Sequence, residues 1–297
     1  MNETVMYQLK EISQYMMCFV IITRENNCIV IDGGRPEDMD ELKQYVGGRH
    51  ISAWILTHAH NDHISGLISE MEKNGGADFD IEAIYYNFPP YDAWMKLVEE
   101  SEADPKHGVV PAPSYMREEL NEMLPAFGRV LPIFQEKAHI VSQGDHLQVD
   151  EIGIDFIFSW HEGLYANPMN DSSLVFMLHG PKQDVLFLGD LGPDAGDILF
   201  FESKDRLKAD MVQMAHHGHM NVGLDVYAKI DPRVCLWCAP KWLYEEPEVP
   251  PYLADREKMI RMKRQRMYGE ALTRQWMEQL GVKEHFVSYQ GPHRFVI

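Results

Sequence analysis

The sequence predicts an α/β protein with two strand-rich halves. Short runs of β-branched and aromatic residues fill 15–87 and return in 138–240. Between some of these runs, helix-forming stretches such as 36–46 and 64–73 end at paired glycines. Several apolar runs also stop at metal-binding residue types. Since strand ends can gather on one edge of a layered sheet, these polar residues are expected to meet.

Length and charge limit the kinds of partner. The chain has 297 residues, and 45% of them are hydrophobic, enough for a sizeable core in one large or two small domains. The net charge of −19 predicts repulsion of nucleic acid and anionic membranes. No secretory signal stands at the N-terminus, and the apolar run 15–23 is too short to span a bilayer. We therefore expect a cytoplasmic protein with a small-molecule substrate, and neither nucleic acid nor membrane as partner.

The four cysteines are too few for a disulfide framework. Cys235 and Cys238 have the spacing of a redox or metal motif, but they lie within the apolar run 233–239, which predicts a buried strand. No second pair completes a four-thiolate site. We expect the pair to be structural.

The first half begins with a hairpin and a helix. Strands are expected at 15–23 and 27–31, separated by a polar turn, and a helix at 36–46. Asp32 follows the second strand and precedes two glycines, which allow close backbone approach. A carboxylate there can orient a neighbouring metal ligand.

The next strand carries the strongest chemical signal. It is expected at 51–57 and runs directly into four ligand-type side chains, His58, His60, Asp62 and His63. Imidazole and carboxylate suit zinc, iron or manganese. His58 and His60 can share one ion while Asp62 and His63 reach a second. A polar surface loop is the alternative, but four such side chains within six positions behind a strand argue against it.

The middle of the chain predicts aromatic and helical segments. The strand 80–87 ends among aromatic residues, which together with two later ones could wall a substrate pocket: Tyr85, Tyr86, Phe88, Trp160 and Tyr165. From 92 to 127 the composition becomes charged and helical, with interruptions at prolines. Strands return at 138–141, 146–149 and 152–160, and His161 follows the last of them.

In the second half, each cluster of candidate ligands again borders an apolar run. Asn170 opens the segment before a strand at 174–178, and the strand 185–188 ends at Asp190. The strand 211–215 ends in three more candidates, His216, His217 and His219.

The C-terminal part predicts a helix and a strand. A helix at 253–280 carries the only dense basic run, for which a solvated helix face is favoured over an anionic partner. The segment 285–297 alternates like a closing strand.

The order of these motifs resembles the metallo-β-lactamase superfamily. The residues that carry the resemblance are His58-x-His60-x-Asp62-His63, Asp32-Gly33-Gly34, Leu188-Gly189-Asp190 and His216-His217-Gly218-His219, within about 15–240. The resemblance implies an αββα sandwich of one domain, 1–297, with the site between its sheets. It also implies a helical cap insertion at 92–127 and a C-terminal extension at 241–297.

The resemblance further implies two divalent metal ions, zinc first, with manganese or iron as alternatives. One ion would take His58 and His60, and the other Asp62, His63 and His217, with Asp190 shared. The superfamily usually supplies a further histidine after the middle strands, where this chain has Asn170; His161 or Asn170 could substitute, or contact substrate. His216 would handle a proton or stabilise a phosphate, although the two neighbours could exchange roles, and His219 would lie outside the ligand shell.

The implied function is a dinuclear hydrolase that uses a metal-bridging hydroxide, beside which Asp62 lies. Asn170 to Ser173, Leu188 to Asp190 and His216 to Gly218 look most like the subgroup of ComEC-type hydrolase domains and phosphorylcholine esterase, which favours a phosphodiester or phosphoester. Hydrolysis of a thioester, lactone or β-lactam is the alternative reaction. A non-catalytic metal-binding or interaction protein is the alternative class.

Overall fold

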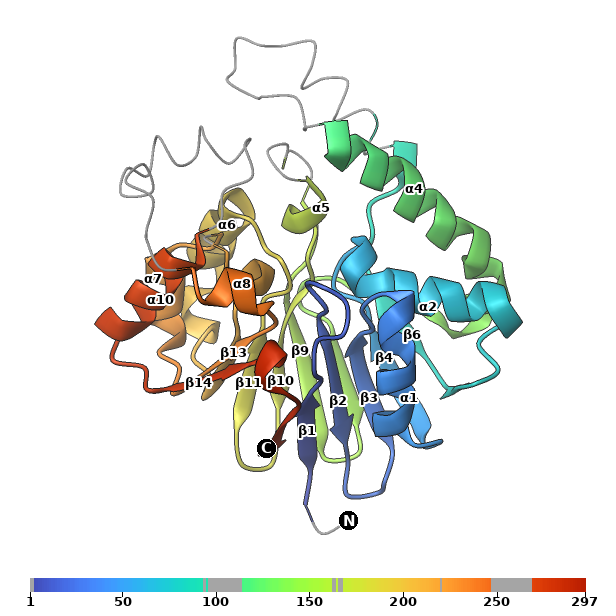
Figure 1. Ribbon diagram of the computed structural model, residues 1–297, viewed down its shortest axis with the longest axis horizontal. Coiled ribbons are helices and arrows are strands. Elements are labelled where there is room, and N and C mark those ends of the chain that lie inside the picture. Colours follow the sequence, from blue (N-terminus) through green and yellow to red (C-terminus); the bar gives the residue numbers. More distant parts are fainter. Residues whose placement is uncertain are drawn as a thin grey trace.

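The computed structural model describes residues 3–92, 95, 114–161, 164, 168–219, 221–246 and 269–297. Two sheets face each other, and helices cover the outer face of each (Figure 1). The predicted αββα sandwich is therefore confirmed.

The first sheet contains eight strands. In spatial order they are β15 (His293–Val296), β1 (Val5–Gln8), β2 (Cys18–Ile22), β3 (Cys28–Asp32), β4 (His50–Ile55), β6 (Ile84–Tyr86) and β7 (Ala138–Ile140), with β5 (Asp80–Ile81) paired to β4. The neighbours from β3 to β7 run parallel.

The second sheet contains seven strands. In spatial order they are β14 (Glu284–Val287), β13 (Val234–Trp237), β12 (Met211–Gln213), β11 (Asp184–Phe187), β10 (Val175–His179), β9 (Ile152–Phe158) and β8 (His146–Val149). The neighbours from β11 to β14 run parallel. The parallel strands within each sheet therefore end on one edge, where their following loops can meet.

The space between the sheets is filled by side chains from both. Every residue of β2 and β3 is buried, as expected for strands covered on two faces. Phe19 packs edge-on against Phe187 of the opposite sheet, with ring centroids 5.1 Å apart. This core fixes the two sheets against each other and so fixes the loops at their common edge.

The outer layers are helical. The first sheet is covered by α1 (Met39–Val46), α2 (Asn61–Asn74) and α4 (Ser114–Val130), and the second by α6 (Pro193–Ser203), α7 (Leu224–Ile230), α8 (Lys241–Tyr244) and α10 (Glu270–Gln279). The short helices are η1 (Pro36–Asp38), η3 (Leu131–Ile133), η4 (Gln135–Lys137), α5 (Pro168–Asp171), η5 (Lys204–Arg206), η6 (Ala215–Gly218) and η8 (Ser288–Gln290).

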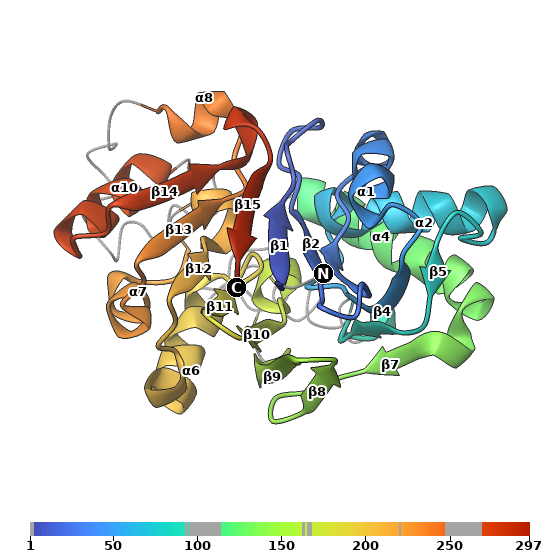
Figure 2. The same ribbon diagram turned by 90° about the horizontal axis from the view of Figure 1, so that it is seen from below.

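Three predicted elements need correction. The helix expected at 64–73 begins at Asn61, so Asp62 lies in its first turn rather than in a loop. The closing strand expected at 285–297 is two strands separated by η8 and by Gly291, whose φ is 132°. Figure 2 shows their separate places: β14 extends the second sheet beside β13, whereas β15 joins the first beside β1. The expected strand 80–87 is likewise divided into β5 and β6.

The predicted cap and long helix are described only in part. In the insertion, α4 begins at Ser114, and its Phe127 side chain is part of the same core cluster as residues of α2. Residues 93, 94 and 96–113 of the insertion lie outside the described residues. The structure describes the C-terminal part of the helix expected at 253–280, as α10. The basic run predicted for that helix lies outside the described residues. All four cysteines are buried free thiols, as expected. In the described parts of the chain, no helix combines the length and apolarity needed to cross a bilayer.

Candidate metal centre

The first ligand loop connects β4 to α2. His58 is fully buried, and His60 has extended backbone angles as the N-cap of α2. Asp62 and His63 then fall in the first helical turn. A carboxylate at that position is favoured by the helix dipole. The rigid helix start therefore holds both side chains.

Asp32 fixes the orientation of His63. Its carboxylate lies 2.7 Å from His63 Nδ1 and accepts hydrogen bonds from the Thr57 backbone N–H and hydroxyl, both at 2.7 Å. The Trp54 indole N–H donates to the Asp32 carbonyl at 2.8 Å. Because His63 Nδ1–H donates to Asp32, Nε2 faces the site. The predicted orienting role of Asp32 matches this geometry.

Asp190 is positioned by a tight turn after β11. Gly189 has φ +56°, and a Cβ atom there would lie 2.9 Å from the Ser173 Cβ. The Asp190 N–H donates to Ser173 Oγ, and its carbonyl accepts from the Asn221 amide, each at 3.0 Å. The turn and both bonds present a buried carboxylate to the opposite sheet.

Two adjacent histidines follow β12 with positive φ, 49° at His216 and 58° at His217. His217 Nδ1 lies 2.8 Å from the Cys238 carbonyl, so Nδ1 donates and Nε2 faces inward. Bulky residues rarely occupy this backbone region. The unusual turn places the two imidazoles differently with respect to Asp190.

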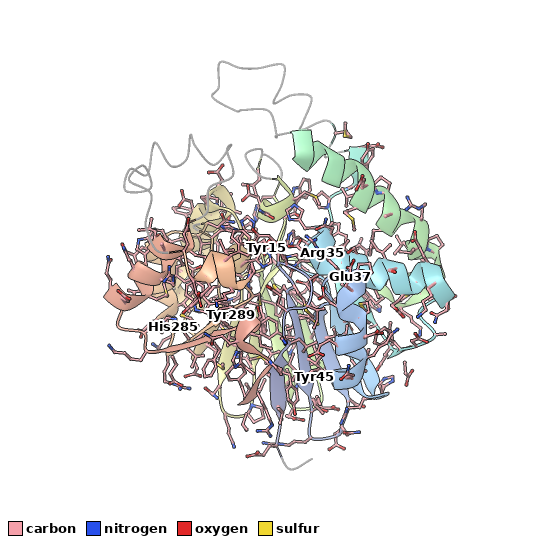
Figure 3. All side chains as sticks on the ribbon, viewed as in Figure 1. Tyr15, Arg35, Glu37, Tyr45, His285 and Tyr289 are labelled. Atoms are coloured by element: carbon pink, nitrogen blue, oxygen red, sulfur yellow. The ribbon has the colours of Figure 1, made fainter. Side chains whose placement is uncertain are left out.

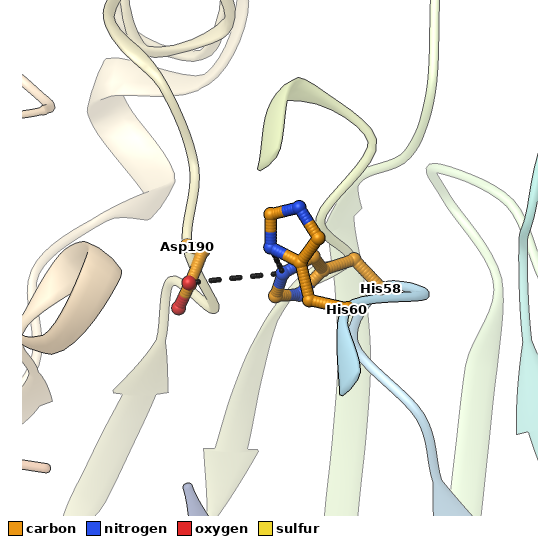
Figure 4. A group of neighbouring side chains, drawn as sticks. All are labelled: His58, His60 and Asp190. Carbon is orange, nitrogen blue, oxygen red and sulfur yellow. Dashed lines mark hydrogen bonds and ion pairs between the residues drawn. The ribbon is translucent and has the colours of Figure 1, made fainter. Parts of the chain in front are cut away.

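The structure brings six predicted ligands into two buried groups. His58, His60 and Asp190 form one, and Asp62, His63 and His217 form the other, with the ligand atoms of each group within 4.8 Å of one another. Figure 4 shows the first group, in which His58 Nε2 lies 3.7 Å from Asp190 Oδ2 and 3.0 Å from His60 Nδ1.

Asp190 also reaches the second group. Its oxygens lie 3.3 Å from His63 Nε2 and 3.3 Å from His217 Nε2, and His217 Nε2 lies 3.2 Å from Asp62 Oδ2. Asp190 thus occupies a position from which it can bridge two ions. With Asp190, the first group has three ligand residues, the number typical of a catalytic zinc site. It reaches this number without the further histidine that the superfamily usually supplies.

The donors fit divalent cations. His63 Nε2, His217 Nε2 and Asp190 Oδ1 are buried and make no hydrogen bond. Each imidazole already donates through Nδ1, so a neutral ring would turn its Nε2 lone pair toward a carboxylate. A bound cation or an added proton resolves that repulsion. Imidazole nitrogens and carboxylate oxygens are suitable ligands for zinc, iron and manganese.

The pKa values follow from the same geometry. Burial favours neutral His217, but Asp190 and Asp62 raise its pKa to about 10. Burial likewise opposes charge on His63, whose pKa the Asp190 and Asp32 carboxylates raise well above its usual range. Burial also opposes ionisation of Asp190, yet the surrounding histidines hold its pKa well below the ordinary value. His63 and His217 therefore favour the protonated form when no metal is bound, held by the carboxylates of Asp32, Asp62 and Asp190.

His216 stands beside both groups but joins neither. Its Nε2 lies 3.8 Å from Asp190 Oδ2, and the Asn221 amide approaches its Nδ1 at 2.8 Å. Since the same amide nitrogen donates to the Asp190 carbonyl, it donates its second hydrogen to Nδ1. Burial lowers the pKa of His216 to about 4. The neutral ring consequently carries its proton on Nε2, next to Asp190.

The two tentative residues have different surroundings. Asn170 is buried, and its side-chain amide lies 3.4 Å from His216 Nε2. His161 stacks on Phe158 and lies 3.9 Å from Glu202, and it belongs to neither ligand group. The geometry therefore brings Asn170, and not His161, to the centre.

Most of the expected aromatic wall lies elsewhere. Tyr86 and Phe88 pack against Phe127 of α4, with ring centroids 5.0 and 4.9 Å away, and Tyr85 stacks on His139. Tyr165 lies outside the described residues. Tyr15 instead lies beside a candidate ligand, with its ring centroid 5.2 Å from that of His217. No motif marks Tyr15, because the contact depends on how the loop before β2 crosses to the second sheet.

The fold and the two groups of candidate metal ligands define a class of α/β-sandwich proteins. Residues 17–230 match the family model of the metallo-beta-lactamase superfamily, and the chain belongs to that superfamily.

Solved structures share the fold at low sequence identity. The metallo-beta-lactamase fold protein YhfI from Bacillus subtilis is 11% identical at a TM-score of 0.54, covering 99% of this chain and 100% of its own. CmlA, a diiron beta-hydroxylase from Streptomyces venezuelae, is 11% identical at a TM-score of 0.53. That match covers 100% of this chain but 55% of CmlA. The curated proteins give no match.

Proposed function

We propose that the protein is a metal-dependent hydrolase of a phosphodiester or phosphoester. The observation that carries the proposal is the position of Asp190, which contacts both ligand groups while His216 stands beside it outside both. Six ligands would hold two ions, and one neutral imidazole remains for the substrate.

Bound divalent ions would supply Lewis acidity toward a phosphoryl oxygen and lower the pKa of a coordinated water. Zinc is the metal we propose, with manganese or iron as alternatives. His58, His60 and Asp190 would hold one ion. Asp62, His63 and His217 would hold the other together with Asp190.

His216 is proposed to stabilise the reacting phosphoryl group. Its Nε2–H can donate to a phosphoryl oxygen as negative charge develops, and Asn221 holds the ring in that tautomer. Asn170, whose amide lies beside the same ring, is proposed to contact the substrate. We propose a phosphorus ester rather than a carbon-centred substrate because of a resemblance to phosphoesterase motifs. The residues that carry it are His216, Asn170 and the segment Leu188 to Asp190. We propose a small substrate, because a net charge of −19 repels long polyanions.

The test compares four substrate classes on protein stripped of metal and reloaded with zinc, manganese or ferrous iron. We expect metal-dependent release of p-nitrophenol from p-nitrophenyl phosphodiesters. A larger kcat/KM on a thioester, lactone or β-lactam would instead support carbon-centred hydrolysis. If two metals bind and none of the four classes reacts, the hydrolase proposal is contradicted in favour of a metal-binding protein.

A further inference from the structure

Four aromatic side chains form a continuous row that starts at the metal centre. The ring centroids of His216 and His219 lie 4.8 Å apart, those of His219 and Tyr15 6.0 Å, and those of Tyr15 and Trp242 5.7 Å. His219 and Tyr15 are stacked, and Trp242 meets Tyr15 edge-on. The row therefore connects Asp190, through His216, to helix α8.

The outer end of the row faces solvent. His219 is 8% exposed, whereas Trp242 is 46% exposed, a large value for an aromatic side chain of this size. Figure 3 shows Tyr15 near the middle of the view, below α5 and between α8 and the start of α2 as Figure 1 places them. The row therefore runs from a buried ring beside the centre to a solvent-exposed ring on α8.

The loop that carries Tyr15 is held in place. Tyr15 has φ +67°, a strained value for an aromatic residue. The Glu11 carboxylate accepts a hydrogen bond from the Tyr15 backbone N–H. Ser13 N–H donates to the Asp38 carboxylate at 2.8 Å. Such strain persists only where the surroundings enforce it, so the ring is presented to His217 in a fixed position.

We propose that Tyr15, His219 and Trp242 form an aromatic subsite that binds an aromatic ring of the substrate beside the metal centre. The inference rests on the proposed function, since it specifies what the phosphoester carries. An aromatic ring suits the site because face and edge contacts add to simple burial of apolar area. The specificity-determining residue is Trp242, the most exposed of the three.

Binding to zinc-loaded protein tests the subsite without turnover. Calorimetry would compare phenylphosphonate with methylphosphonate, two ligands with the same anionic head. We expect the wild-type protein to bind the phenyl compound roughly tenfold more tightly. Trp242→Ala should reduce that preference by roughly three- to tenfold and leave the methylphosphonate affinity unchanged.

Two further variants sharpen the test. Tyr15→Leu keeps an apolar side chain but removes the ring, and it should reduce the phenyl preference as Trp242→Ala does. Phe201→Ala removes an aromatic side chain that is 84% exposed on α6, and it should change neither affinity. Zinc content would be measured in each protein, and Trp242→Ala decides the question if Tyr15→Leu loses metal.

Three results would overturn the proposed subsite. The wild-type protein could bind the two phosphonates with equal affinity, or fail to bind phenylphosphonate. The phenyl preference could also survive in Trp242→Ala. The proposed function fails separately, when no phosphodiester is hydrolysed although the phenyl preference is present.

Discussion

His216 and His217 are neighbours in sequence with different surroundings. Both have positive φ, and the turn directs His217 into the second ligand group while His216 remains beside Asp190. A backbone hydrogen bond to Cys238 fixes one ring, and a side-chain hydrogen bond from Asn221 fixes the other. We infer that the backbone strain at this turn is what allows two adjacent imidazoles to serve one centre.

Replacing His216 should reduce turnover without removing metal. In His216→Ala we expect kcat to fall by about 10²- to 10³-fold, the range for loss of one donor to a developing negative charge. Both metals should remain, because His216 belongs to neither ligand group. Kinetics with metal analysis of the same sample would check this, with His139→Ala on edge strand β7 as control. Loss of a metal from His216→Ala would show that it is a ligand.

Replacing Asp62 should remove metal and activity but keep the fold. In Asp62→Ala the second group loses its own carboxylate, so we expect at most one tightly bound metal and turnover reduced by at least about 10²-fold. The core contacts of β4 and α2 do not depend on Asp62. The matched control is Asn61→Ala in the same helical turn. Wild-type activity of Asp62→Ala with both metals present would refute this role.

At the residue scale, the sequence identified those residues whose roles can be recognised from their own short segment. The six candidate ligands were predicted because each lies just after a strand, in a motif with characteristic spacing. Asn221, the Cys238 carbonyl and Tyr15 could not be identified, because their roles arise from contacts between loops of different strands. His161 follows a strand too, yet its ring turns to Phe158 and Glu202.

Among the elements, the turn between β11 and Asp190 is sensitive to an added side chain. Gly189 needs a positive φ, and an added Cβ would contact Ser173 and Thr57 at 3.2 Å or less. We expect Gly189→Ala to lower the free energy of unfolding by about 2 to 4 kcal/mol and to weaken metal binding. Gly48→Ala is the matched control, since Gly48 has φ +69° but no atom within 4 Å of the added Cβ. Its cost should be about 1 kcal/mol. Equal costs in denaturant titrations would contradict the steric argument.

Element boundaries were less predictable than element types. The hairpin, the helix after Asp32 and the buried strand around Cys235 were confirmed, because their apolar patterns are strong. The C-terminal segment was expected to form one strand, since alternation does not show that η8 sends its two parts to different sheets. The start of α2 was placed too late because its first turn is occupied by ligands rather than apolar residues.

For the whole molecule, proton and metal binding should be linked to stability. The pKa of His217 is raised from about 6.5 to about 10 in the folded metal-free protein. Its contribution to stability is therefore complete below about pH 6.5 and is lost as the pH rises through about 10. We expect the Tm of metal-free protein to fall over this window, and that of His217→Gln to fall less. In metal-loaded protein the decline should be smaller, because metal takes the place of the proton. Equal slopes for the three samples in thermal melts would contradict the linkage.

The most direct test of the central claim is anomalous diffraction from crystals of the zinc-loaded protein, recorded at the zinc absorption edge. We predict two peaks in each chain, one among His58, His60 and Asp190 and the other among Asp62, His63 and His217, with Asp190 contacting both. A single peak, or two peaks of which neither contacts Asp190, would contradict the account.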